Sequence, residues 1–359
     1  MRVKKVAIYF WLFLPILTTF ALNNRKFRFF QVVLFFISCF GLYFLLGFRA
    51  VEVGTDTGAY YSSFFRIESA EFPFSLRYEP AYVLMNLAIQ NIGFGPEVLI
   101  AVCSLIIIFS LVYCCLLISP SLGLSLILYA GIFGYFFAFN GMRQAVAQSL
   151  ILLGFTLFEK GYRKLGCFSY LLAPLFHYTA VVFFPFLLLF LVKKERLIIL
   201  LPLCWLISLF FVISATPFQM MSSFLFQLSP AIYSNYVDNI SLSGDVGVLT
   251  AFYQLVFIFI YMSFSRCKCN MQYKVMLLGM LGVISANILN YSGFVSRLSL
   301  YWELFLILAL PIASSYFYRF RFKVLISFLL FFVASIFYYR AVFVSSNNIS
   351  PYSSWLLEL

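Results

Sequence analysis

Apolar runs of about eighteen residues recur along the whole chain, and each is long enough to cross a bilayer core of roughly 30 Å as a helix. Of the 359 residues, 64% are hydrophobic and only 10% are charged. A soluble protein needs about 25% charged residues to cover its surface, and the alternating segments of a transmembrane barrel are absent. The sequence therefore predicts an all-α, polytopic integral membrane protein with a single transmembrane domain over residues 1–359.

About twelve membrane segments are expected. Ten are predicted to be helical spans, at 6–22, 29–47, 97–118, 121–139, 141–159, 197–215, 248–264, 273–290, 297–317 and 324–343. The segment 165–192 would be about 42 Å long as one helix, and Pro174 and Pro185 would break it. Basic residues flank both of its ends, which places both ends in the cytoplasm. We therefore predict a hairpin of two short limbs that meet at His177.

Basic residues also orient the rest of the chain. Fifteen of the 24 lysines and arginines fall in five loops on one face, and an excess of positive charge marks the cytoplasmic side. The long loops 48–96 and 216–246 and the C-terminal tail are then expected outside the cytoplasm, although the basic N-terminus disagrees with this rule. The net charge of +12 thus reflects membrane topology and not nucleic-acid binding.

Beyond the first five residues, the expected outer face carries arginine and no lysine. Its arginines are Arg49, Arg66, Arg77, Arg143, Arg297 and Arg340. An arginine at membrane depth costs about 2.5–3.5 kcal/mol on insertion scales and normally faces a cavity or a partner. Its paired donors match phosphate oxygens, so the cluster indicates a phosphate-bearing lipid substrate. For Arg66 and Arg340 the favoured alternative is contact with the interface or with lipid headgroups.

Two of these arginines lie on polar helix edges. Arg143 opens the segment "NGMRQAVAQSLILL", in which Asn140, Gln144 and Gln148 share one edge at helical spacing. Arg297 begins "SRLSLYWELF", whose serines and glutamate also align at helical spacing. We therefore expect Arg143 and Arg297 to belong to a site.

Three residues are candidates for a catalytic base. His177, the only histidine, lies at the apex of the expected hairpin, where a broken helix pair survives only if it is buried or lines a cavity. Glu79 and Asp56 belong to the first exterior loop, where neighbouring arginines would keep them ionised and weakly basic. We rank His177 first, because imidazole titrates nearest to neutral pH, followed by Glu79 and then Asp56. The alternative is that His177 has a structural role, in which its hydrogen bond only orients the helix break.

Several kinds of chemistry lack support in the sequence. It contains no Walker sequence for nucleotide hydrolysis and no H-E-x-x-H for metalloprotease chemistry. It also contains no nucleophile elbow for serine hydrolysis and no D-x-D pair for nucleotide-sugar use at a metal site. Cys267 and Cys269 form a Cys-x-Cys pair without further ligands, a weak signal for zinc. None of the eight cysteines lies in an expected exterior loop. We expect no metal, no other cofactor and no disulfide.

Five short motifs occur in order along the chain. They are "RAVEVGTDTGAYYSSF" (49–64), "RYEPAY" (77–82), "FNGMRQAVA" (139–147), "LFHYTA" (175–180) and "SRLSLYW" (296–302). Together they resemble the EpsG-like family of Wzy-type O-antigen and capsular polysaccharide polymerases. Thr57 departs from the pattern, because the family usually has an aromatic residue after the aspartate, and this puts the local substrate contacts in question.

The resemblance implies an enzyme of the bacterial cytoplasmic membrane whose active site faces the exterior. Such enzymes transfer the reducing end of a growing glycan onto a hydroxyl of the next repeat unit, and undecaprenyl diphosphate leaves. The implied partners are undecaprenyl-diphosphate-linked oligosaccharides, the lipid bilayer, a chain-length regulator and a flippase. The candidate residues for binding the diphosphate and its sugar are Arg143, Arg49, Arg297, Arg77, Gln144, Asn140 and Tyr60.

Two other classes of function share these features. A flippase for the same lipid-linked sugars would usually show two similar halves and charge throughout the membrane, and neither is visible in the sequence. An O-antigen ligase or a membrane acyltransferase would share the arginines and the large outer loop. In a deletion strain, lipid capped with a single unit would favour a polymerase, whereas polymer still attached to undecaprenyl diphosphate would favour a ligase.

Overall fold

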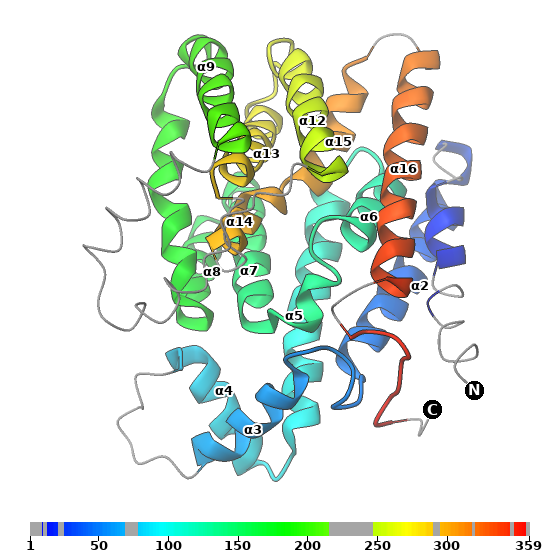
Figure 1. Ribbon diagram of the computed structural model, residues 1–359, viewed down its shortest axis with the longest axis vertical. Coiled ribbons are helices and arrows are strands. Elements are labelled where there is room, and N and C mark those ends of the chain that lie inside the picture. Colours follow the sequence, from blue (N-terminus) through cyan, green and yellow to red (C-terminus); the bar gives the residue numbers. More distant parts are fainter. Residues whose placement is uncertain are drawn as a thin grey trace. The chain divides into compact units, whose positions relative to one another are not determined.

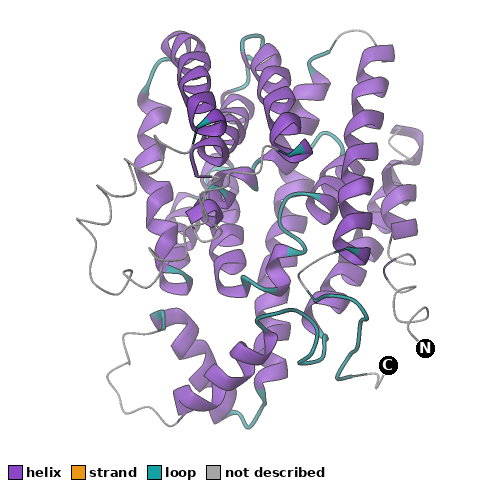
Figure 2. Ribbon diagram, viewed as in Figure 1, coloured by secondary structure: helices purple, strands orange, loops and turns teal. Residues whose placement is uncertain are grey.

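The computed structural model describes residue Tyr9 and residues 13–20, 25–68, 78–214, 247–289, 295–317, 320–344 and 348–356. These residues form helices and connecting loops, and the only strand-like pairing among them is an isolated antiparallel bridge between Arg49 and Ser354 (Figure 2). Helices suit a bilayer because each one satisfies its backbone hydrogen bonds within its own segment. The all-α prediction is therefore confirmed for the described residues.

Several described helices are long and apolar enough to cross a membrane. Five meet this condition singly, namely α2 (Arg28–Gly47), α5 (Pro96–Ile118), α9 (Lys194–Ile213), α13 (Asn270–Leu289) and α16 (Phe320–Phe343). A bent pair, Val295–Glu303 and Leu306–Ser315, would make a sixth span, with 41° between its two parts. The chain is thus a polytopic membrane protein, whereas the expected count of about twelve segments is not confirmed.

Two of the expected spans correspond to helices of fewer than 18 residues in the structure. The span expected at 121–139 ends early, because α6 (Leu122–Gly131) is followed by a turn and the single-turn 3-10 helix η2 (Phe137–Phe139). The helix α12 (Val248–Phe264) has the expected bounds but contains only 17 residues. Neither of these helices has the length for a complete span of about 20 residues.

The expected break at His177 is present. The helix α8 (Arg163–Phe176) ends there, His177 is extended, and the 3-10 helix η3 (Tyr178–Leu191) follows. The chain also divides into two compact units, unit 1 (1–181 and 320–359) and unit 2 (182–319). Because the boundary between the units lies within η3, the folding back of the two limbs stays a prediction. The exterior loop 216–246 lies outside the described residues.

In unit 1, the helices α7 (Met142–Glu159) and α8 form an antiparallel pair. A Cβ atom on Gly154 would lie 3.1 Å from the carbonyl oxygen of Gly166, and one on Gly166 would lie 2.9 Å from that of Gly154. The two backbones therefore approach closely only because both residues are glycines. Since the helices are antiparallel, the end of α8 at His177 lies beside the start of α7 at Met142.

The exterior loop 48–96 contains two helices of its own, α3 (Thr57–Glu68) and α4 (Pro80–Asn91). They pack together at one end of unit 1, close to the start of α5 (Figure 1). The hydroxyl groups of Ser63 and Tyr82 lie 3.0 Å apart and join the two helices. This loop is thus a folded element that holds the residues at the start of α4 in place.

In unit 2, α13 packs against α14 (Leu300–Glu303) and α15 (Leu306–Ser315). Gly282 allows this approach, because a Cβ atom there would lie 2.9 Å from the backbone of Glu303. A partly buried amide pair joins α12 to α13, since Nε2 of Gln254 donates to Oδ1 of Asn287 at 2.8 Å. Trp205 of α9 donates to Gln254 at 2.8 Å, so polar contacts connect three helices of this unit.

Candidate active site

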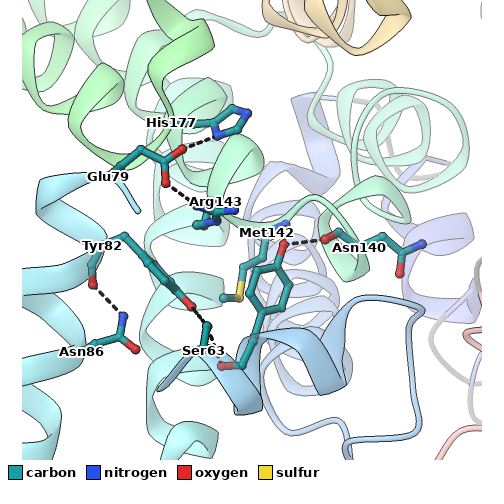
Figure 3. Close-up of polar contacts among 9 residues, drawn as sticks. Ser63, Glu79, Tyr82, Asn86, Asn140, Met142, Arg143 and His177 are labelled. Carbon is teal, nitrogen blue, oxygen red and sulfur yellow. Dashed lines mark hydrogen bonds and ion pairs between the residues drawn. The ribbon is translucent and has the colours of Figure 1, made fainter. Parts of the chain in front are cut away.

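The clearest cluster of charged side chains in unit 1 is centred on Glu79. Its Oε2 atom pairs with Nη1 of Arg143, and its Oε1 atom lies 2.8 Å from Nδ1 of His177. Figure 3 shows the carboxylate between the guanidinium and the imidazole ring. The side chain of Glu79 is 5% exposed, whereas those of Arg143 and His177 are 26% and 23% exposed. The carboxylate is thus buried beneath two groups that a substrate can reach.

Local sequence explains why the three side chains meet. Glu79 is the extended residue before α4, whose first position is Pro80, and proline favours a helix start because its missing N–H would have no partner there. Arg143 is the second residue of α7, and His177 follows the last residue of α8. The antiparallel packing of α7 and α8 then places these two ends side by side. The cluster is built from three helix termini.

The surroundings of Glu79 keep it ionised. Burial alone would raise the pKa of its carboxyl group, but the hydrogen bond with His177 and the charge of Arg143 outweigh burial, so the pKa lies below its ordinary value. A carboxylate accepts hydrogen bonds and cannot donate them. Nδ1 of His177 is therefore the donor toward Glu79, and in the neutral tautomer that carries this proton Nε2 is the acceptor.

Two tyrosines flank the guanidinium of Arg143. The Cζ atom of Arg143 lies 5.7 Å from the ring centre of Tyr78 and 5.3 Å from that of Tyr82. Such cation–π contacts hold a guanidinium plane without using its N–H donors. Glu79 accepts from Nη1 only, and within the described part of the chain no other protein acceptor contacts the guanidinium. Several N–H groups thus stay available for an anion.

The hydroxyl group of Tyr60 holds the start of α7 in place through contacts with Asn140 and Met142. The Tyr60 hydroxyl donates to the carbonyl of Asn140 at 2.5 Å and accepts the backbone N–H of Met142 at 2.9 Å. Burial raises the pKa of Tyr60 to about 12, so its phenol stays protonated at neutral pH. The Asn140 side chain accepts the backbone N–H of Thr55 at 2.8 Å. The segment before α7 is therefore bound to the loop before α3.

Arg49 lies in the interior and not at an open surface. Its side chain is 0% exposed. It donates to Thr57 Oγ1 at 3.0 Å, to the carbonyl of Leu46 at 2.5 Å and to that of Phe139 at 3.2 Å. The Phe139 ring also lies 5.2 Å from its guanidinium. These contacts indicate that Arg49 fastens the loop 48–57 to the segment before α7, in contrast to the substrate contact expected from the sequence.

The structure does not bring every sequence candidate to this cluster. Asp56 is partly exposed and accepts a hydrogen bond from Thr55 Oγ1 at 3.1 Å, but no described hydrogen bond or ion pair joins it to Glu79. Gln144 and Gln148 of α7 are buried, as is Asn140, which precedes the helix and does not share its edge as expected. Arg77 lies outside the described residues.

The remaining arginine candidates are exposed. Arg66 is at the end of α3 and Arg340 is in the last turn of α16. Arg297 belongs to the 3-10 helix η5 (Val295–Leu298) of unit 2. Its expected place beside Arg143 therefore stays a prediction.

Two structural contributions to the site and its surroundings were not predicted from the sequence. The flanking tyrosines Tyr78 and Tyr82 stand in the quoted motif "RYEPAY", yet their residue type gave no sign that their rings would contact an arginine. The C-terminal tail was also missed. Its residue Ser353 accepts the backbone N–H of Ala50 at 2.9 Å, and its Ser354 Oγ donates to the carbonyl of Phe48 at 2.7 Å. The tail thereby covers the loop that carries Arg49.

The cluster has the parts of a proton-accepting site beside a cation. An imidazole oriented by a carboxylate can take a proton at its second nitrogen. A guanidinium with available donors can stabilise a developing phosphate charge. The arrangement therefore suits transfer of a group onto a hydroxyl with a phosphate as the leaving group.

A comparison with protein-family models matches residues 32–354 to the model described as the EpsG family. The matched range includes every residue of the Glu79 cluster and both compact units except their terminal segments. No curated protein and no solved structure matches the chain.

Proposed function

The chain belongs to the EpsG family, a family of Wzy-like polysaccharide polymerases, and we propose that it polymerises oligosaccharide repeat units carried on undecaprenyl diphosphate. The reaction takes place at the extracytoplasmic face of a bacterial cytoplasmic membrane. The anomeric carbon of the growing chain forms a bond with a hydroxyl oxygen of the next unit. Its bond to the diphosphate breaks, the hydroxyl proton goes to a base, and undecaprenyl diphosphate leaves.

One observation supports this proposal above the others, namely that Glu79 bridges Arg143 and His177. A purely structural ion pair needs only the carboxylate and the arginine. The third member adds an imidazole whose Nε2 has no hydrogen-bond partner among the described residues. A base and an anion-binding group thus contact the same carboxylate. A glycosyl transfer from a diphosphate needs both groups near the reacting atoms.

His177 acts as the base in this proposal. Its Nε2 atom takes the proton of the acceptor hydroxyl as the new glycosidic bond forms. The carboxylate of Glu79 orients the ring through Nδ1 and compensates the positive charge that the ring acquires. General-base catalysis of this kind contributes roughly 10²–10⁴-fold to a rate.

Arg143 stabilises the leaving group. In the resting site Glu79 balances its charge, which keeps the cluster close to neutral before the substrate binds. When His177 becomes protonated, the same carboxylate must also balance the imidazolium. Arg143 then interacts more strongly with the departing diphosphate, so base and anion-binding group act in the same step.

The test uses purified protein and lipid-linked oligosaccharide extracted from a strain that lacks this chain. A polymerase converts single repeat units into a ladder of longer products that remain linked to undecaprenyl diphosphate, and it releases undecaprenyl diphosphate. Transfer of preformed polymer onto a different acceptor, without a ladder, would indicate a ligase and contradict the proposal. Movement of unchanged substrate across a vesicle membrane would indicate a flippase and also contradict it.

A further inference from the structure

The helix α7 begins abruptly and carries Arg143 on its first turn. Gly141 precedes the helix and contributes no side-chain hydrogen bond as a cap. The first N–H groups of a helix have no partner within the helix, so they must find acceptors elsewhere. The start of α7 therefore depends on groups from other parts of unit 1.

Tyr60 of α3 supplies the missing cap. Its hydroxyl accepts the backbone N–H of Met142, the residue directly before Arg143, and donates to the carbonyl of Asn140. One oxygen atom thus joins the last residues of the preceding loop to the first residue of the helix. Met142 and Asn140 are labelled in Figure 3, next to Arg143.

We propose that Tyr60 is a positioning residue of the active site, which holds the first turn of α7 so that Arg143 meets Glu79 and the substrate in the reactive geometry. This role rests on the proposed function, and it replaces the direct substrate contact expected for Tyr60 from the sequence. The phenol is 8% exposed, and both hydrogen-bonding functions of its oxygen are used within the protein. Tyr60 therefore acts on the reaction through Arg143.

Other contacts keep the fold in place when the hydroxyl is removed. Arg49 still binds the carbonyl of Phe139, and Thr55 still binds the side chain of Asn140. Tyr60→Phe also retains the buried ring. The variant therefore removes the hydrogen bonds that hold the start of α7 without creating a cavity.

The experiment is a double-mutant cycle on the polymerisation rate of purified protein, with lipid-linked oligosaccharide from the deletion strain as substrate. The four proteins are wild type, Tyr60→Phe, Arg143→Ala and the double variant. We expect Tyr60→Phe to lower kcat about tenfold, because small displacements of a catalytic group cost rate, while KM changes less than about twofold. In the Arg143→Ala background the same change should lower kcat less than about twofold, since coupled residues are not additive.

Tyr61→Phe is the matched control. Tyr61 neighbours Tyr60 on α3, is half-buried and interacts with Glu97 instead of α7, so its variant should keep the wild-type rate. A tenfold loss from Tyr60→Phe that persists in the Arg143→Ala background would overturn the positioning role. A wild-type rate in Tyr60→Phe would overturn it as well. Absence of polymer with the wild-type protein would instead contradict the proposed function itself.

Discussion

Two buried glutamates of this chain differ in their neighbours and not in their burial. Glu79 of unit 1 and Glu303 of unit 2 are 4% and 5% exposed. Glu79 bridges an arginine and a histidine. Glu303 accepts hydrogen bonds from the hydroxyl groups of Tyr253 and Ser299, and no cation pairs with it among the residues that the structure describes.

The difference shows what a buried carboxyl group needs for proton chemistry. A carboxyl group held by two hydroxyls ties helices together but has neither an imidazole to orient nor a guanidinium to balance. A carboxylate held by an imidazole and a guanidinium can orient a base and balance the charge that the base acquires. In the proposed function, Glu79 therefore supports the base His177, and Glu303 has a structural role.

The largest effect that the comparison predicts is that of Glu79→Gln. The amide keeps the size of the side chain but loses the charge that orients His177 and balances Arg143. We expect the polymerisation rate to fall about 10³-fold, somewhat less than the loss of about 10⁴-fold seen when the carboxylate behind a catalytic histidine is neutralised. The rate is measured with purified protein, and protein amount and thermal unfolding are compared with wild type.

Glu303→Gln is the matched control for this variant. Glutamine can accept one of the two hydrogen bonds through its oxygen and donate through its NH2 group to the other hydroxyl, whose oxygen also accepts. The rate should therefore stay within about threefold of wild type, as expected away from catalytic groups. Equal losses from the two variants would remove the distinction between the two glutamates.

The second effect concerns the shape of the cation. Arg143→Lys keeps a positive charge but loses the planar group that lies by two tyrosine rings and presents several donors. We expect a rate about 100-fold below wild type, nearly as low as that of Arg143→Ala. Normal polymer from Arg143→Lys at normal protein levels would contradict recognition of the diphosphate by paired donors at this position.

The sequence was sufficient to predict the class of fold and to single out the three residues that meet in the candidate site. Long apolar runs specify membrane helices because no other structure satisfies the backbone in lipid. Arg143, Glu79 and His177 were all candidates, because charge and proline breaks stand out against an apolar background. Their meeting was not predictable, since His177 and Glu79 are 98 residues apart and meet only because α4 and α7 both pack against α8.

The burial of Arg49 was not predictable for a related reason. In the sequence it stands among glycine and acidic residues, which is typical of an exposed loop. Its burial depends on Phe139 and on the C-terminal tail around Ser354, which are distant in the chain. The early end of α6 was also missed, because the residues after Gly131 are almost all apolar and only Gly134, with φ of +125°, interrupts them.

The smallest effect is a dependence of stability on pH. The pKa of Glu79 is lower in the folded protein than its ordinary value of 4.5. Glu79 therefore contributes stability that is fully present above about pH 4.5 and is lost as the pH falls through its folded pKa. On going from pH 6 toward pH 3.5, the Tm of the wild type should fall by a few degrees more than that of Glu79→Gln. If the Tm of the two proteins, measured in the same detergent, fell equally with falling pH, an ionised Glu79 between Arg143 and His177 would be contradicted.

The polymerisation rate of His177→Gln tests the central claim most directly. Glutamine keeps a hydrogen-bonding side chain of similar reach beside Glu79 but cannot take the proton of the acceptor hydroxyl. With purified protein at matched amounts, the account predicts a rate about 10³-fold below wild type, while Glu303→Gln stays near wild type in the same assay. A near-wild-type rate for His177→Gln would contradict the account and move the role of base to Glu79.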